Sequence, residues 1–320
     1  MRTSSSRIAI ALMLTALLPA SAQSQTDWPT KAVTVVVPFA AGGNTDVMAR
    51  MASKHLSEAL KQTFVVENRV GAGGAIAAAY VAQAAPDGYT LLFGAAPQIA
   101  VVPKIQAVKY DPHKDLAPVS VFGTGPFILA INAATPAKTM QEYVAWAKAR
   151  KGNYGSGGTG SIGHLSGALF VARAGIDAVH VPFTGGGPAM TALVGGQIDM
   201  YFGNASELIP QAEAGKLRIL GVATDKRMQQ LPGVPTISEL FPNFSLNSWN
   251  GFLAPGRTPQ AVIDKLAKYV IAAARDPANV AQLTKLGIEA NGTTPQEFAA
   301  QIAREQPQFD AAIKAANMTK

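Results

Sequence analysis

Short apolar runs alternate along this chain with segments of helical periodicity, and this alternation restricts the possible folds more than any other feature. AVTVVVPF (32–39), FVVEN (64–68) and TLLFGA (90–95) are β-branched and apolar, as is typical of strands buried on both faces. A helical segment opened by Asn44-Thr45-Asp46 and an alanine-rich segment lie between them. Strand and helix in strict alternation predict parallel strands joined by right-handed crossovers, and therefore an α/β fold.

A second cycle of the same kind follows. The strands predicted for it are FILAIN (127–132), NYGSGG (153–158), AVHVPF (178–183), IDMYFG (198–203) and LRILGVA (217–223). Helices are expected between them, the first of which begins with a capping box of Thr139 and Glu142. The carboxy-terminal region differs, since it contains three helices that each start with a capping residue followed by proline, at Thr258-Pro259, Asp276-Pro277 and Thr294-Pro295.

The two cycles predict two doubly wound α/β lobes joined by a hinge of strands around a cleft. The connecting strands are expected in PVSVFGTGPF (118–127) and FSLNSWNGFLA (244–254), and the carboxy-terminal helices would then return to the first lobe. Lobe 1 is therefore predicted at residues 27–124 plus 250–320, and lobe 2 at residues 125–249. Such an arrangement closes around a ligand.

Residues 1–22 have the pattern of a secretory signal peptide. Arg2 and Arg7 precede an apolar stretch that is shorter than a membrane span, and Ala20-Ser21-Ala22 supplies a cleavage site. An exported protein of the periplasm is expected. Cysteine is absent, which excludes disulfides and thiolate chemistry. The net charge of +7 is spread along the chain with 7% aromatic residues, a pattern that does not predict nucleic-acid binding.

Five glycine-rich segments follow predicted strands, where ligands bind in open α/β sheets. They are PFAAGGNTD (38–46), ENRVGAGG (67–74), GAAPQ (94–98), SGGTGSIGH (156–164) and PFTGGGPA (182–189). Glycine lets backbone N–H groups approach a ligand, and helix amino termini favour anions. Any one of these loops is explained by a tight turn alone. Together they predict a site for a carboxylate.

No catalytic, metal or cofactor motif is convincing. GSGGTG (155–160) matches a dinucleotide fingerprint, but the segment before it is short and polar and Asp177 precedes the next strand, so a nicotinamide cofactor is rejected. There is no G-x-S-x-G or H-E-x-x-H, and the four histidines lack metal-ligand spacing. We therefore expect no enzyme, no cofactor and no metal.

Three side chains allow two interpretations each. His164, one turn after a glycine loop, either donates to a ligand or makes a structural hydrogen bond. Asp46 either complements the dipole of its helix or meets a ligand amine. Trp249, on the second connecting strand, belongs either to the core or to the wall of the cleft.

The chain resembles the extracytoplasmic receptors of tripartite tricarboxylate transporters, the TctC-like or Bug receptors. The resemblance covers nearly the whole mature chain and depends on nine segments in order: WPTKAVTVVVPFAAGGNTD, ENRVGAGG, PDGYTLLFG, GGTGSIGHL, VHVPFTGGGPA, LVGGQIDM, GKLRILGVATDKR, LPGVPTISE and SWNGFLAPGRTP. It implies a type II periplasmic-binding-protein fold. It also implies a monomer that captures a small organic acid or amino acid and delivers it to a membrane permease with one large and one small subunit.

The resemblance also implies that backbone amides and water hold the ligand carboxylate. Together with Asp46, His164 and Trp249, the candidate ligand-binding residues are Phe39, Ala41, Gly42, Gly43, Ala72, Gly73, Ala96, Pro97, Ser156, Gly158, Thr159, Ser161, Phe183, Thr184 and Gly185. The chain departs from the family where Phe183-Thr184 replaces a common tyrosine–lysine pair and Ala168 replaces a frequent acidic residue. These changes predict a less polar far half of the pocket.

Two other functions use the same residues. A periplasmic sensor would present the closed form to a signalling partner, and a neighbouring permease or kinase gene would distinguish it from a transport receptor. An exported enzyme would need His164 as a lone base. Turnover of a bound ligand would reveal it.

Overall fold

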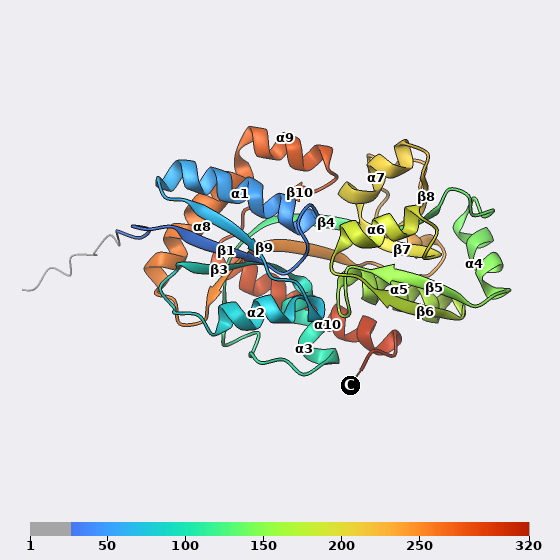
Figure 1. Ribbon diagram of the computed structural model, residues 1–320, viewed down its shortest axis with the longest axis horizontal. Coiled ribbons are helices and arrows are strands. Elements are labelled where there is room, and N and C mark those ends of the chain that lie inside the picture. The colour runs from blue at the N-terminus through green and yellow to red at the C-terminus, as the bar shows by residue number, and fades with distance from the viewer. Residues whose placement is uncertain (1–26, 320) are drawn as a thin grey trace, which may run out of the picture.

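The computed structural model describes residues 27–319, so the predicted signal peptide lies outside the described residues. Two α/β lobes lie side by side along the long axis of the molecule (Figure 1). The predicted fold of two doubly wound lobes joined by strands is confirmed. The lobe boundaries at residues 124/125 and 249/250 stay a prediction.

Lobe 1 is built on three parallel strands in the order β2-β1-β3. They are β1 (Val33–Val37), β2 (Phe64–Asn68) and β3 (Thr90–Ala95), each in a segment predicted to be a strand. The intervening helices are α1 (Asn44–Leu60) and α2 (Ala75–Ala82), the second preceded by a short helical turn, η1 (Ala72–Gly74). A π-helical turn, η2 (Pro97–Val101), and α3 (Val102–Ile105) follow β3.

Lobe 2 repeats this arrangement with the order β6-β5-β7. Its strands are β5 (Gly152–Ser156), β6 (Ala178–Pro182), β7 (Met200–Asn204) and β8 (Leu217–Val222). Its helices are α4 (Met140–Lys148), α5 (Ile162–Ala174), α6 (Gly186–Val194) and α7 (Ala205–Glu213), and the turn η3 (Ile237–Glu239) follows β8. Residues 154–156 of β5 are buried, so the judgement that no buried strand precedes the glycines of GSGGTG is wrong.

Two long antiparallel strands join the lobes. β4 (Leu116–Asn132) pairs with β9 (Asn247–Pro255) over its first part and with β7 and β8 over its last. The two strands predicted at 118–127 and 127–132 are therefore one continuous strand. Each lobe then has the same order, three parallel strands followed by an antiparallel connecting strand, although the sequence shows no exact repeat.

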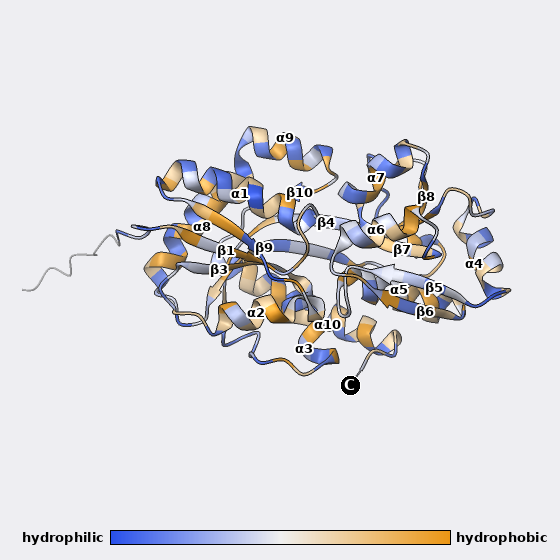
Figure 2. Ribbon diagram, viewed as in Figure 1, coloured by the Kyte–Doolittle hydropathy of each residue, from blue (hydrophilic) through white to orange (hydrophobic). Residues whose placement is uncertain are grey.

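The carboxy-terminal helices are α8 (Gln260–Arg275), α9 (Pro277–Lys285) and α10 (Pro295–Ala315), with β10 (Glu289–Ala290) paired to β4. α8 packs on α1 and β4, whereas α10 also contacts α5 of lobe 2, so the helical tail is not confined to lobe 1. Figure 2 shows α1, α8 and α9 with mixed hydrophilic and hydrophobic sides, as expected of helices that bury one face.

The predicted capping residues are confirmed at three of the four helices, α4, α9 and α10. Asp276 caps α9, and Thr294 with Glu297 forms the capping box of α10. Thr139 caps α4, but the carboxylate of Glu142 accepts from the N–H of Lys138, so that capping box is incomplete. The expectation that Thr258 caps α8 is wrong, because the helix begins one residue after Pro259 and the buried Thr258 hydroxyl has no partner among the described residues.

Candidate functional site

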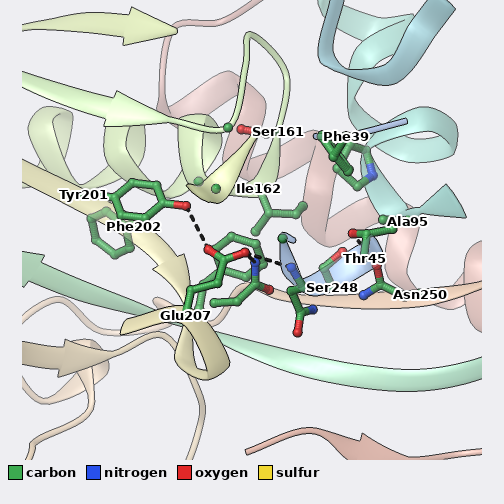
Figure 3. Close-up of a pocket in the computed structure, with 18 residues that line it drawn as sticks. Phe39, Thr45, Ala95, Ser161, Ile162, Tyr201, Phe202, Glu207, Ser248 and Asn250 are labelled. Carbon is green, nitrogen blue, oxygen red and sulfur yellow. Dashed lines mark hydrogen bonds between the residues drawn. The ribbon is translucent and has the colours of Figure 1, made fainter. Parts of the chain in front are cut away.

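The carboxyl ends of the parallel strands of both lobes face one another across a cleft. A first cavity of about 50 Å³ lies there (Figure 3). Its lining residues come from both lobes and the connecting strands: Phe39, Gly43, Asn44, Thr45, Ala95, Pro97, Phe127, Gly157, Ser161, Ile162, Gly163, Gly186, Tyr201, Phe202, Asn204, Glu207, Ser248 and Asn250. Apolar, aromatic and glycine residues make up just over half of the lining, and polar side chains enter from α1, β7, α7, β9 and the N-cap of α5.

A second cavity of about 250 Å³ adjoins the first at Phe39 and Gly157, which line both. It is formed by the glycine-rich loops of the two lobes. Its lining residues are Pro38, Phe39, Gly71, Ala72, Gly73, Gly74, Gly157, Gly158, Thr159, Pro182, Phe183 and Thr184. None of these side chains carries a charge, so backbone groups and the side chains of Thr159 and Thr184 supply the polar contacts available there.

The lobes touch directly around these cavities, and the structure therefore represents a closed form. The N–H of Ala40 donates to the carbonyl of Thr184 at 3.2 Å. The hydroxyl of Ser206 on α7 donates to Oδ1 of Asn44 on α1 at 2.7 Å. A Cβ placed on Gly73 would lie 2.0 Å from the carbonyl oxygen of Thr159, so only glycine permits this approach.

The loop before α1 is held in shape by the buried Asp46. Its carboxylate accepts from the N–H of Gly42 at 2.9 Å and from the side chains of Arg50 and Asn68 at 2.8 and 2.9 Å. Burial opposes ionisation, but these hydrogen bonds hold the pKa of Asp46 below its usual value. Asp46 therefore stays charged and orders the loop, and it lines neither cavity.

Glu207, in the first turn of α7, reaches across the cleft to α1. Its Oε1 accepts from the N–H of Asn44 at 2.9 Å, and its Oε2 accepts from the hydroxyl of Tyr201 at 3.3 Å. Figure 3 shows the hydroxyl of Tyr201 directed at the carboxylate of Glu207. Burial raises the pKa of Glu207 although these hydrogen bonds act against the shift. The first free N–H of α1, a natural anion site, is thus occupied by a carboxylate of the protein itself.

The glycine loop of lobe 2 is held by two stacked histidine rings. His164 and His180 have ring centroids 3.7 Å apart with planes inclined by 13°. Nδ1 of His164 accepts from the N–H of Gly160 at 3.0 Å, and Nε2 of His180 bonds the hydroxyl of Ser156 at 2.7 Å. Burial, followed by the neighbouring His180, lowers the pKa of His164 to about 3, and burial lowers that of His180 to about 4. Both rings are neutral near pH 7, and that of His164 is a weak base.

The cavities bring together ten of the candidate residues. Phe39, Gly43, Pro97 and Ser161 line the first cavity, and Phe39, Ala72, Gly73, Gly158, Thr159, Phe183 and Thr184 line the second. The candidates that line neither are Ala41, Gly42, Asp46, Ala96, Ser156, His164, Gly185 and Trp249. Ser156 and His164 act within their own loop, and Gly185 packs against Ala40 of the facing lobe. Ala168, which departs from the family pattern, is buried in α5.

Trp249 belongs to the core, which is the first of its two interpretations. It is 2% exposed and packs edge-on against Phe298 of α10, with ring centroids 4.7 Å apart. Its neighbour Asn250 lines the first cavity instead and accepts from the hydroxyl of Thr45 at 2.8 Å. Successive side chains of a strand point to opposite faces, so the polar residue one place along was the better candidate.

Sequence reasoning also missed Asn204 and Glu207, which line the first cavity. Asn204 is the last residue of β7 and precedes α7, and Glu207 lies in the first turn of α7. The rule that selected five other strand ends applied here too, but this junction contains no run of glycines. The end of a strand at the start of a helix was sufficient to predict a ligand contact here, but only strand ends rich in glycine were selected.

Neither a metal-binding cluster nor a membrane-spanning helix is found among the described residues. Within residues 27–319 no group of three or more His, Asp or Glu side chains is placed to hold a metal ion. In the same range no helix is both long and apolar enough to span a bilayer.

Comparison with known proteins identifies a family. The family model described as "Tripartite tricarboxylate transporter family receptor" matches residues 48–318. A UPF0065 protein of Bordetella bronchiseptica is 35% identical over 310 residues, which cover 97% of this chain and 92% of that protein.

Two solved structures of Rhodopseudomonas palustris proteins superpose closely. Rpa4515, determined with adipate, is 34% identical with a TM-score of 0.88, covering 92% of this chain and 99% of that one. MatC, determined with bound malate, is 33% identical with a TM-score of 0.86. The superposition covers 89% of this chain and 100% of MatC. Both ligands are small dicarboxylates.

Proposed function

Because this chain belongs to the tripartite tricarboxylate transporter receptor family, whose members are periplasmic solute-binding receptors, we propose that it captures a small carboxylate between its lobes and delivers it to a membrane permease. The observation that carries the proposal is the meeting of uncharged glycine loops from both lobes around adjoining cavities. Backbone N–H groups in such loops bind an anion without a cationic side chain. The adipate and malate bound by the two R. palustris proteins support a ligand of this chemical class.

The proposal places the mature chain in the periplasm as a monomer that releases its ligand unchanged. The stacked, weakly basic His164 argues against hydrolysis, since its Nδ1 lone pair is used by Gly160 and its pKa of about 3 leaves it a poor base. Closure is stabilised by contacts from both lobes to one ligand, so that affinity and conformation are linked.

Calorimetric titration with adipate, malate, succinate and glutarate tests binding, with the corresponding diamides as uncharged controls of the same shape. We expect at least one acid to bind and its diamide to bind at least tenfold more weakly. At a hundredfold excess over its Kd, the bound acid should stabilise the protein by about 2.7 kcal/mol. Equal binding of acid and diamide would contradict carboxylate recognition.

Delivery to a permease is tested separately in cells. Uptake of the radiolabelled acid that binds should fall when this protein is deleted and recover when it is supplied again. Unchanged uptake at acid concentrations near the measured Kd would contradict a transport role while leaving binding intact. Chemical change of the acid during incubation with the purified protein, followed by NMR, would instead indicate an enzyme.

A further inference from the structure

Glu207 is the one charged side chain among the residues that line the first cavity. Burial raises its pKa, and its half-buried side chain lines the cavity. Among the described residues it takes part in none of the ion pairs, whose acidic partners are Asp46, Glu67, Asp310, Asp111, Asp199 and Glu239. A carboxylate without a cation partner therefore faces the space in which the ligand is proposed to bind.

The surroundings of Glu207 leave room for its carboxylate. A Cβ on Gly186 would lie 2.2 Å from Oε2 of Glu207, so the glycine at the start of α6 is what lets the carboxylate fit. Oε1 accepts from the N–H of Asn44 at 2.9 Å and from Nδ2 of Asn204 at 3.5 Å, whereas Oε2 has only the 3.3 Å bond from Tyr201. A carboxylate offers about four lone-pair positions, so Glu207 can accept further donors from a ligand.

A second polar group of the cavity lacks a partner and is complementary to Glu207. Asn44 is 4% exposed and lines the cavity, and its side-chain Nδ2 donates to nothing among the described residues. In the same first turn, the N–H groups of Thr45 and Asp46 have no acceptor within the helix. Donors suited to a ligand carboxylate thus lie beside an acceptor suited to a ligand cation.

The charge of the site separates two ligand classes. A plain dicarboxylate would bring a carboxylate next to Glu207 with no positive charge to compensate it, and no lining residue of the first cavity is cationic. A ligand with an ammonium group beside its carboxylate would neutralise Glu207 through a charge-assisted hydrogen bond and present its carboxylate to the α1 donors. The cavity of about 50 Å³ has room for roughly three to five waters, which suits the head group of an amino acid.

We propose that Glu207 determines specificity by pairing with an ammonium group of the ligand, so that the cleft prefers an amino acid to the plain dicarboxylate of the same length. The inference rests on the proposed function, since it assumes that a carboxylate binds in this cleft. The rest of the ligand would extend past Phe39 and Gly157 into the uncharged second cavity.

A matched series of acids tests this pairing. Succinate, malate and L-aspartate share one carbon skeleton and differ by hydrogen, hydroxyl or ammonium at one carbon. Calorimetry at pH 7 should show aspartate binding at least tenfold more tightly than succinate. The pairs glutarate with glutamate and adipate with 2-aminoadipate repeat the comparison at other lengths, and we expect the same order at the length that fits.

The variant Glu207→Gln keeps the size of the side chain and an acceptor for Asn44, but removes its charge. It should reduce the ratio of the amino-acid affinity to the dicarboxylate affinity at least tenfold. Glu213→Gln is the matched control, because it makes the same change at an exposed position of the same helix and should leave the ratio unchanged. A thermal melt verifies that each variant is folded.

The outcomes distinguish this inference from the proposed function. If the wild-type protein binds a plain dicarboxylate or malate as tightly as the amino acid of the same length, the ammonium pairing is wrong. Capture of a carboxylate, the proposed function, would stand. A Glu207→Gln variant that folds and retains the wild-type ratio would also overturn the pairing. If no acid of any length binds, the proposed function fails and the inference fails with it.

Discussion

If the proposed function holds, single residues at the amino terminus of α1 determine how the cleft binds an anion. Gly43 precedes the helix with ordinary extended backbone angles, and a Cβ there would meet Ala40 and Glu207 at 3.5 Å, which is normal contact. The position therefore tolerates a side chain. Its glycine leaves the N–H groups of Thr45 and Asp46 open to a ligand, since Glu207 already accepts from that of Asn44, whereas an acidic residue would compete for those groups as a capping side chain.

Gly43→Asp should weaken binding of a carboxylate at least tenfold, about 1.4 kcal/mol, because the added charge repels the ligand and lies next to Glu207. Gly43→Asn has the same shape and capping ability without the charge and should retain most of the affinity. Titration calorimetry with the best-binding acid measures both. Equal losses in the two variants would show that occupation of the site, and not charge, is responsible.

At the scale of elements, the loop between β5 and α5 depends on the stacked pair of His164 and His180. Each ring accepts or shares a hydrogen bond with this loop, at Gly160 and Ser156. Protonation would charge two rings whose centroids are 3.7 Å apart in a partly buried setting. The folded loop therefore favours the neutral form of both histidines.

The folded pKa values of about 3 and 4 lie below the usual 6.5, so the unfolded chain binds more protons between about pH 4 and 6.5. The stabilisation from neutral histidines is complete above pH 6.5 and decreases as the pH falls through this window. Denaturant titrations should show a falling free energy of unfolding and an uptake of up to about two protons.

The double variant His164→Gln with His180→Phe should make the free energy of unfolding less dependent on pH between about pH 4 and 6.5. His113→Gln, at an exposed position, is the control and should keep the wild-type slope. A wild-type profile that is flat between pH 4 and 6.5 would contradict the role given to the histidine pair.

Closure depends on the contact of η1 with the loop that follows β5. A Cβ on Gly73 would overlap the carbonyl of Thr159 at 2.0 Å, so Gly73→Ala should prevent the closed form and weaken ligand binding at least tenfold. Gly175→Ala is a matched control, since Gly175 has φ +59° against +64° for Gly73 but open space around it. Both variants pay a left-handed backbone cost of roughly 1–2 kcal/mol in stability.

Calorimetry separates the loss of closure from the backbone cost that both variants share, because only the Gly73 variant should lose affinity for the ligand. Similar affinities for both variants would show that the lobes close without this approach. In that case the close contact between Gly73 and Thr159 would not be needed for binding.

At the scale of the whole molecule, β4 and β9 hold two similar lobes whose facing loops meet when the cleft is closed. The cysteine-free chain allows this motion to be tested with a single engineered pair. A Cβ on Gly185 lies 3.0 Å from the Cβ of Ala40, about 0.5 Å below the lower end of the roughly 3.5–4.5 Å found in disulfides.

The double variant Ala40→Cys with Gly185→Cys should therefore oxidise in the closed form. Adding the best-binding acid should speed disulfide formation, as followed on non-reducing gels, and oxidation should slow release of the bound acid. The single-cysteine variants are the controls and should show neither effect. Ligand that slows disulfide formation would contradict closure around the ligand.

The sequence alone determined the alternating α/β architecture, the connecting strands and the family. Buried strands and amphipathic helices have local periodicities, and the nine matching segments are likewise read along the chain. The loops at 38–46, 67–74, 156–164 and 182–189 were found because glycine marks a close backbone approach wherever it occurs.

Only the tertiary structure decided which polar side chains enter the cleft. Trp249 and Asn250 alternate on one strand, and the packing of α10 decided which of them is buried in the core. The bond from Asn44 to Glu207 joins residues 163 positions apart on different lobes. Local patterns carry no information on such a pair, because its distance depends on the path of two connecting strands and on how far the lobes close.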